Sequence, residues 1–148
     1  MIVEKWGGDL YHISVVYVAN TLTAFILMNI MASKIQLSNI TKFKIGIGCT
    51  TFVFVGLSFV TEWWMAMPFM SLVGATWAFL FIGGNFHLME NNPRSTSTGI
   101  FSSTLSIATV IGPVIAGTIA FMFDYIAVMY FAIAIIICAF VVSLKIKK

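Results

Sequence analysis

Charged residues are scarce in this sequence of 148 residues, of which only 9% are Asp, Glu, Lys or Arg. Soluble globular domains usually carry about 25% charged residues. Apolar residues make up 60% of the chain and aromatic residues 15%, and the mean hydropathy is +1.03. The shortage of charge therefore excludes an ordinary water-soluble domain and indicates a chain that lies in a lipid bilayer.

Cysteine and histidine are also rare. The two cysteines, Cys49 and Cys138, lie in separate apolar stretches, too few and too isolated for a disulfide framework or a metal site. The two histidines, His12 and His87, lie near the ends of apolar stretches, and no acidic residue lies within one. These absences argue against a nucleophilic enzyme, and the sequence predicts no cofactor.

Long uncharged stretches separate the few charges. They cover residues 10–33, 45–61, 63–89, 95–123 and 125–144, and the shortest has 17 residues. A helix needs about 20 apolar residues to cross roughly 30 Å of hydrocarbon. We therefore predict an all-α polytopic membrane protein with one domain over residues 1–148. Its five transmembrane helices are expected at about 13–33, 45–61, 63–88, 97–122 and 125–144.

The basic residues predict an orientation, because Lys and Arg accumulate in cytoplasmic loops. If the C-terminus is inside, only Lys5 lies outside, and seven basic residues lie inside: Lys34, Lys42, Lys44, Arg94, Lys145, Lys147 and Lys148. We thus expect a multi-pass protein of the cell (cytoplasmic) membrane with its N-terminus outside and its C-terminus cytoplasmic. Because no aromatic platform accompanies these charges, the expected partner is the lipid bilayer and not a nucleic acid.

The fourth stretch is rich in small residues. They recur at three- and four-residue steps, which places them on one stripe of a helix: Thr98, Ser102, Ser106, Thr109, Pro113, Ala116 and Ala120. Gly112 and Gly117 widen this stripe, and small residues let helix backbones approach closely in lipid. Pro113 removes one backbone hydrogen bond. The pattern predicts a bent helix that makes a close helix contact near Gly112 and Gly117.

Segments along most of the chain resemble a known family. A polar turn containing "NNPRS", the segment "STGIFSSTLSIATVIGPVIAG", a short turn "FDY" and an apolar last helix resemble the end of a major facilitator superfamily (MFS) transporter. The segment "GATWAFLFIGGNFHLMENNP" is similar to the tenth helix of that family, and "EKWGGDLYHISVVYVANTL" resembles the approach to its eighth helix. The resemblance thus covers nearly the whole chain, as the eighth to twelfth helices of a C-terminal six-helix half.

The resemblance implies a place for a substrate. In the family the eighth, tenth and eleventh helices face a central cavity, and polar groups kept within a membrane tend to face protein or water. The substrate-cavity candidates are Tyr17, Asn20, Thr21, Trp77, Ser102 and Ser106. Other interpretations stay open: Asn20 and Thr21 could bond to a neighbouring helix, Trp77 could face lipid or core, and the serines could serve helix packing.

Two functions follow from these patterns. The first is transport of a small solute by alternating access, as the C-terminal part of an MFS transporter. Because the chain lacks the family's first half and its seventh helix, this portion is not expected to transport alone, and a missing N-terminal half or a second copy is the expected protein partner. The alternative is a stand-alone five-helix membrane structural or assembly subunit without transport.

Overall fold

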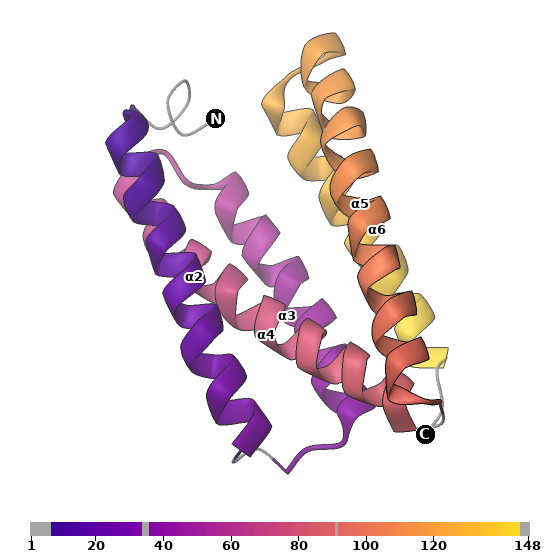
Figure 1. The fold of residues 1–148 in the computed structure, drawn as a ribbon. Helices are drawn as coiled ribbons and strands as arrows, with labels where there is room; N and C mark the ends of the chain where they lie inside the picture. The colour runs from indigo at the N-terminus through magenta and orange to yellow at the C-terminus, as the bar shows by residue number, and fades with distance from the viewer. Residues whose placement is uncertain (1–6, 34–35, 91, 146–148) are drawn as a thin grey trace.

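The computed structural model describes residues 7–33, 36–90 and 92–145, and it is helical throughout its regular elements. The elements are α2 (Leu10–Ser33), α3 (Asn39–Ser58), the short 3-10 helix η1 (Trp63–Met65), α4 (Ala66–Glu90), α5 (Arg94–Met122) and α6 (Tyr125–Lys145) (Figure 1). Five segments of the described chain are long and apolar enough to cross a membrane. The expectation of an all-α chain with five helices able to span a membrane is thereby confirmed.

The helix starts differ from the predicted spans where polar residues cap a helix. Helix α3 begins at Asn39, six residues before the predicted span, because the Ser38 hydroxyl accepts a hydrogen bond from the Thr41 N–H at 3.3 Å. Lys42 and Lys44 therefore lie on the first turns of α3 and not in a loop. A change from charged to apolar side chains does not mark a helix start, because a charged side chain can reach the interface from within a helix.

Helix α5 begins at Arg94, with Pro93 as its N-cap and no side-chain cap bond. The serines and threonines at the start of this helix therefore do not cap it. The Ser97 hydroxyl instead donates to the Leu88 carbonyl at 3.0 Å, and Ser97 is only 1% exposed. A serine of the turn thus joins the start of α5 to the end of α4.

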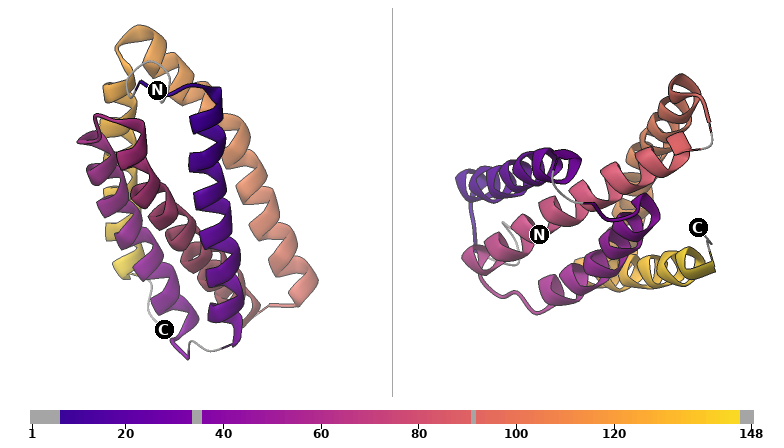
Figure 2. Two further views of the ribbon diagram at one scale, coloured as in Figure 1. Left: turned by 90° about the vertical axis from the view of Figure 1, so that its left-hand side faces the viewer. Right: turned by 90° about the horizontal axis from the view of Figure 1, so that it is seen from below.

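Helix α4 is the centre of the bundle. It packs most extensively against α3 and α2, which lie on its two sides (Figure 2). Helix α6 packs mainly against α3, and α5 makes smaller contacts with α4 and α6. The apolar core lies where α3, the start of α4 and α6 meet, and its buried residues are Val53, Leu57, Val60, Ala66 and Met129.

Several glycines of α3 and α4 make close contacts with a neighbouring helix. A Cβ at Gly83 would stand 2.5 Å from the Phe43 nitrogen of α3. A Cβ at Gly46 would stand 2.9 Å from the Leu80 nitrogen of α4. Because Gly46 and Gly83 have no side chain, the backbones of α3 and α4 can come into direct contact.

The small-residue stripe of α5 makes no such contact. Nothing beyond their own helix lies within 4 Å of where a Cβ of Gly112 or Gly117 would stand, among the residues described. A groove of about 260 Å³ beside Gly112 separates α5 from α6. The expected close contact near Gly112 and Gly117 is therefore not made within the described part of the chain. Helix α5 continues through Pro113, and its bend stays a prediction.

Several basic residues gather at one end of the bundle. Helices α3 and α5 begin there and α2, α4 and α6 end there (Figure 1). We call it the basic end, because it carries Lys42, Lys44, Arg94 and Lys145. The predicted anchors Lys5, Lys34, Lys147 and Lys148 lie outside the described residues. That the basic end faces the cytoplasm stays a prediction.

Candidate functional site

A groove between α2 and α4 brings together three of the predicted cavity residues. It has a volume of about 450 Å³, and its lining residues are Asn20, Thr21, Ala24, Phe25, Met28, Val73 and Trp77. Asn20 and Thr21 are adjacent on α2, and Ala24 lies one turn further along it. Val73 and Trp77 are one helical turn apart on α4. The groove is mostly apolar with two polar side chains, as is usual for small-molecule sites.

Only some of the polar side chains that line the groove have a hydrogen-bond partner. The Thr21 hydroxyl donates to the Tyr17 carbonyl of its own helix at 3.0 Å, so Thr21 is not bonded to a neighbouring helix. The Asn20 backbone lies against Gly74 of α4, and the Asn20 side-chain amide lines the groove. Among the described residues, no hydrogen bond engages the Asn20 side chain. An amide in this position can donate to and accept from a ligand.

Tyr17 lies one turn before Asn20 and Thr21, toward the start of α2. It is 57% exposed and borders a second groove of about 450 Å³, which it shares with Thr21 and Phe25. Because Thr21 and Phe25 line both grooves, the two form one continuous surface along α2. The structure thus places Tyr17 beside the other α2 candidates, at the edge of the first groove.

An aromatic series extends from Trp77 to α5. The ring centroids of Trp77 and Phe81 are 6.3 Å apart, and those of Phe81 and Phe101 are 5.4 Å apart with the rings edge to face. Trp77 itself is 42% exposed, so it is not a core residue. Phe81 and Phe101 were not among the residues predicted from the sequence. The four-residue step from Trp77 to Phe81 was the available signal, since such residues share a helix face.

Ser102 and Ser106 lie apart from the groove. Both are exposed on α5, the first within one turn of Phe101, and neither lines the groove between α2 and α4. Among the described residues they make no side-chain hydrogen bond. Their hydroxyls therefore form a separate polar line on α5, and a ligand role for them stays a prediction.

Hydroxyls elsewhere bond to their own helices. The Thr50, Thr51 and Ser58 hydroxyls of α3 donate to the carbonyls of Gly46, Ile47 and Val55. These three polar side chains of α3 are thus hydrogen-bonded within their own helix. In α4, by contrast, the buried Oδ1 of Asn85 has no hydrogen-bond partner in the described chain. An unpaired buried amide oxygen is costly, so Asn85 is a position where a water or ligand would be stabilised.

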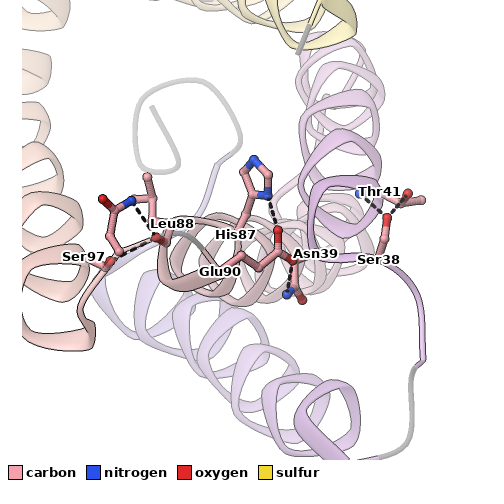
Figure 3. Close-up of polar contacts among 8 residues, drawn as sticks. Ser38, Asn39, Thr41, His87, Leu88, Glu90 and Ser97 are labelled. Carbon is pink, nitrogen blue, oxygen red and sulfur yellow. Dashed lines mark hydrogen bonds and ion pairs between the residues drawn. The ribbon is translucent and has the colours of Figure 1, made fainter. Parts of the chain in front are cut away.

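Two polar clusters lie at opposite ends of the bundle. At the start of α2, Asp9 Oδ1 accepts from the His12 N–H at 3.0 Å, and the His12 ring lies 3.9 Å from the Trp63 ring. The His12 backbone N–H holds the pKa of Asp9 below its usual value. At the basic end, Glu90 bonds to both Asn39 and His87 (Figure 3). In the described residues, no group of three or more His, Cys, Asp or Glu side chains could hold a metal ion.

No protein-family model, curated protein or solved structure matches this chain.

Proposed function

We propose that the chain takes part in the transport of a small solute across a membrane by alternating access, as the C-terminal portion of an MFS-type transporter. The observation that carries this proposal is the groove between α2 and α4, where Asn20, Thr21 and Trp77 lie together. These residues come from the helices that correspond to the eighth and tenth of the family. Helix α5, which corresponds to the eleventh, continues the same aromatic surface through Phe101.

The distribution of polar groups supports the proposal. Asn20 and Trp77 are open to a ligand, whereas the hydroxyls of α3 bond within their own helix. Helix α6 is almost entirely apolar, with a buried Ser143 near its end. Transporters of this kind bind substrate near the bilayer midplane between two halves. The surface of α2, α4 and α5 would form one wall of such a site.

A binding measurement on the chain tests the groove. A variant with Trp6, Trp63 and Trp64 replaced by Phe keeps Trp77 as its one tryptophan. Titration with a panel of labelled sugars, drugs and organic acids should give saturable quenching of Trp77 fluorescence by at least one compound class. Asn20→Ala should weaken that quenching about tenfold, which corresponds to the loss of one well-formed hydrogen bond in a site without water.

The matched control is Asn29→Ala, an asparagine of the same helix whose amide donates to the Phe25 carbonyl and which does not line the groove. It should leave the quenching unchanged. If the panel gives no saturable signal with the chain and none with a co-reconstituted N-terminal half, the transport proposal is wrong, and the assembly-subunit alternative is then favoured.

Transport by the chain alone is not expected. Alternating access requires one half to move against the other, and α2 to α6 form a single wall. In liposomes, the purified chain should therefore show no saturable uptake of the panel compounds. Saturable uptake that Asn20→Ala abolishes would overturn the hypothesis that the chain is only a portion of a transporter, and it would indicate that a dimer of the chain transports.

A further inference from the structure

A cavity at the basic end is separate from the groove described above. It has a volume of about 530 Å³ and lies where α3 begins, α4 ends and α5 begins. Its lining residues are Asn39, Phe86, Met89, Glu90 and Arg94. The cavity therefore combines one carboxylate, one guanidinium and one amide with two large apolar side chains, in a chain with few charges.

The carboxylate in this cavity is held in place. Glu90 Oε1 accepts from the Asn39 amide at 2.9 Å, and Glu90 Oε2 lies 2.9 Å from His87 Nδ1 (Figure 3). These bonds orient the carboxylate while its side chain stays 45% exposed. Because a carboxylate offers about four lone pairs, Glu90 can accept further hydrogen bonds from a cationic donor.

The cation in the cavity is available. Arg94 is exposed, and no ion pair within 4.0 Å engages it in the part of the chain that the structure describes. Glu90 and Arg94 thus line one cavity as two separate charges of opposite sign. A guanidinium binds phosphate oxygens with two parallel hydrogen bonds. The pair therefore matches a molecule that carries both a phosphate and an ammonium group.

The position of the cavity favours a membrane lipid over a soluble ligand. The apolar span of α4 ends at Glu90, so the cavity lies at the level where hydrocarbon gives way to headgroups. Phe86 and Met89 form its apolar wall, and Phe86 is 38% exposed. A lipid would place its phosphate at Arg94, its ammonium at Glu90 and its glycerol and acyl carbons against Phe86 and Met89.

We propose that this cavity binds the headgroup of an aminophospholipid of the phosphatidylethanolamine class. A primary ammonium donates three hydrogen bonds, whereas the quaternary ammonium of phosphatidylcholine donates none. Phosphatidylglycerol has the phosphate but no cation for Glu90. The site therefore selects phosphatidylethanolamine over both, and this selection does not depend on transport.

Photocrosslinking tests the lipid site. The full chain is reconstituted in phosphatidylcholine vesicles that contain a trace of phosphatidylethanolamine with a photoactivatable acyl chain. Unlabelled phosphatidylethanolamine should compete for labelling at about tenfold lower content than additional phosphatidylcholine or phosphatidylglycerol, as expected for a charge-assisted hydrogen bond. Equal competition by phosphatidylcholine would overturn the proposal. Equal competition by phosphatidylglycerol would show attraction of anionic lipid alone, and competition by free phosphoethanolamine would show a soluble ligand; both outcomes contradict it.

Variants of Glu90 and Arg94 test the role of each charge in lipid binding. Glu90→Gln should remove the preference for phosphatidylethanolamine over phosphatidylcholine in the competition, whereas Arg94→Gln should weaken labelling by the phosphatidylethanolamine probe itself, because the probe loses the partner of its phosphate. Arg94→Lys should keep part of the labelling, and Lys145→Gln, a cation of α6 outside the cavity, is the matched control and should change nothing. Helical content by circular dichroism shows that each variant is folded. A folded Glu90→Gln variant that keeps the full lipid preference would contradict the proposal.

Discussion

Gly74 of α4 lies directly against the backbone of Asn20 in α2. A Cβ at Gly74 would overlap the Asn20 carbonyl oxygen and stand 3.0 Å from the Ala24 nitrogen. The two atoms belong to backbone, so they cannot turn aside as a flexible side chain could. This contact fixes the distance between α2 and α4 beside Asn20, whose side chain lines the candidate groove.

We therefore expect Gly74→Ala to destabilise the protein by about 1–3 kcal/mol, because the added methyl group would force the two helices apart. Gly117→Ala is the matched control, since a Cβ there meets no neighbour within 4 Å. It should leave stability unchanged or raise it by up to about 1 kcal/mol through helix propensity. Unfolding in a detergent titration measures both variants. Equal losses of stability would contradict the packing described for α2 and α4.

A second prediction concerns the joint between α4 and α5. Ser97→Ala should lower the free energy of unfolding by about 1 kcal/mol, because it removes the hydrogen bond from the buried hydroxyl to the Leu88 carbonyl. Ser102→Ala, at an exposed position on the same helix, should have no measurable effect. The thermal midpoint in detergent reports the difference. A loss at Ser102 equal to that at Ser97 would show that the joint does not depend on this bond.

The start of α2 should depend on pH. Asp9 and His12 form a reciprocal cap, in which the Asp9 carboxylate accepts from the His12 N–H and the Asp9 N–H donates to His12 Nδ1 at 3.1 Å. The pKa of Asp9 is lowered chiefly by the His12 backbone N–H. A lowered pKa means that the stabilisation is present above the ordinary pKa of aspartate, about 3.9, and is lost as the pH falls through the folded value.

The measurement compares the wild-type chain with Asp9→Asn, which caps a helix without titrating. Because the His12 ring also lies 2.8 Å from the Asp9 carboxylate, both chains are measured again with His12→Gln, which keeps the backbone N–H. With His12→Gln in both chains, the difference between their thermal midpoints should be constant from neutral pH to about pH 5 and should change below about pH 4. A constant difference across the whole range in both backgrounds would contradict the role of Asp9.

The orientation can be tested by cysteine labelling, in a background where the exposed Cys49 and Cys138 are replaced by Ser. With the basic end in the cytoplasm, Gln36→Cys and Thr96→Cys should resist a membrane-impermeant maleimide in intact cells and react after lysis. Phe123→Cys, exposed at the opposite end, should react in intact cells. The reverse pattern would show that the basic end faces outward.

The number and order of the membrane helices could be predicted from the sequence. Crossing hydrocarbon is a local property of about 20 consecutive residues, so the uncharged stretches located all five spans. Their ends shifted by several residues where a polar group satisfied the backbone, as Ser38 does for α3. The candidate site was predicted in part, because Asn20, Thr21 and Trp77 are polar or aromatic residues within apolar helices.

The contacts between helices depend on the tertiary structure. Gly74 and Gly117 are both glycines within apolar helices, yet the first meets a backbone and the second meets nothing within 4 Å. Lipid gives helices no hydrophobic reason to associate, so close packing depends on the shapes of two helices together, and one helix alone does not carry that information. For the same reason the sequence alone does not show that Asn39 lies beside Glu90 and Arg94, because Asn39 and Glu90 are 51 residues apart in the chain. The tertiary structure brings them to one cavity.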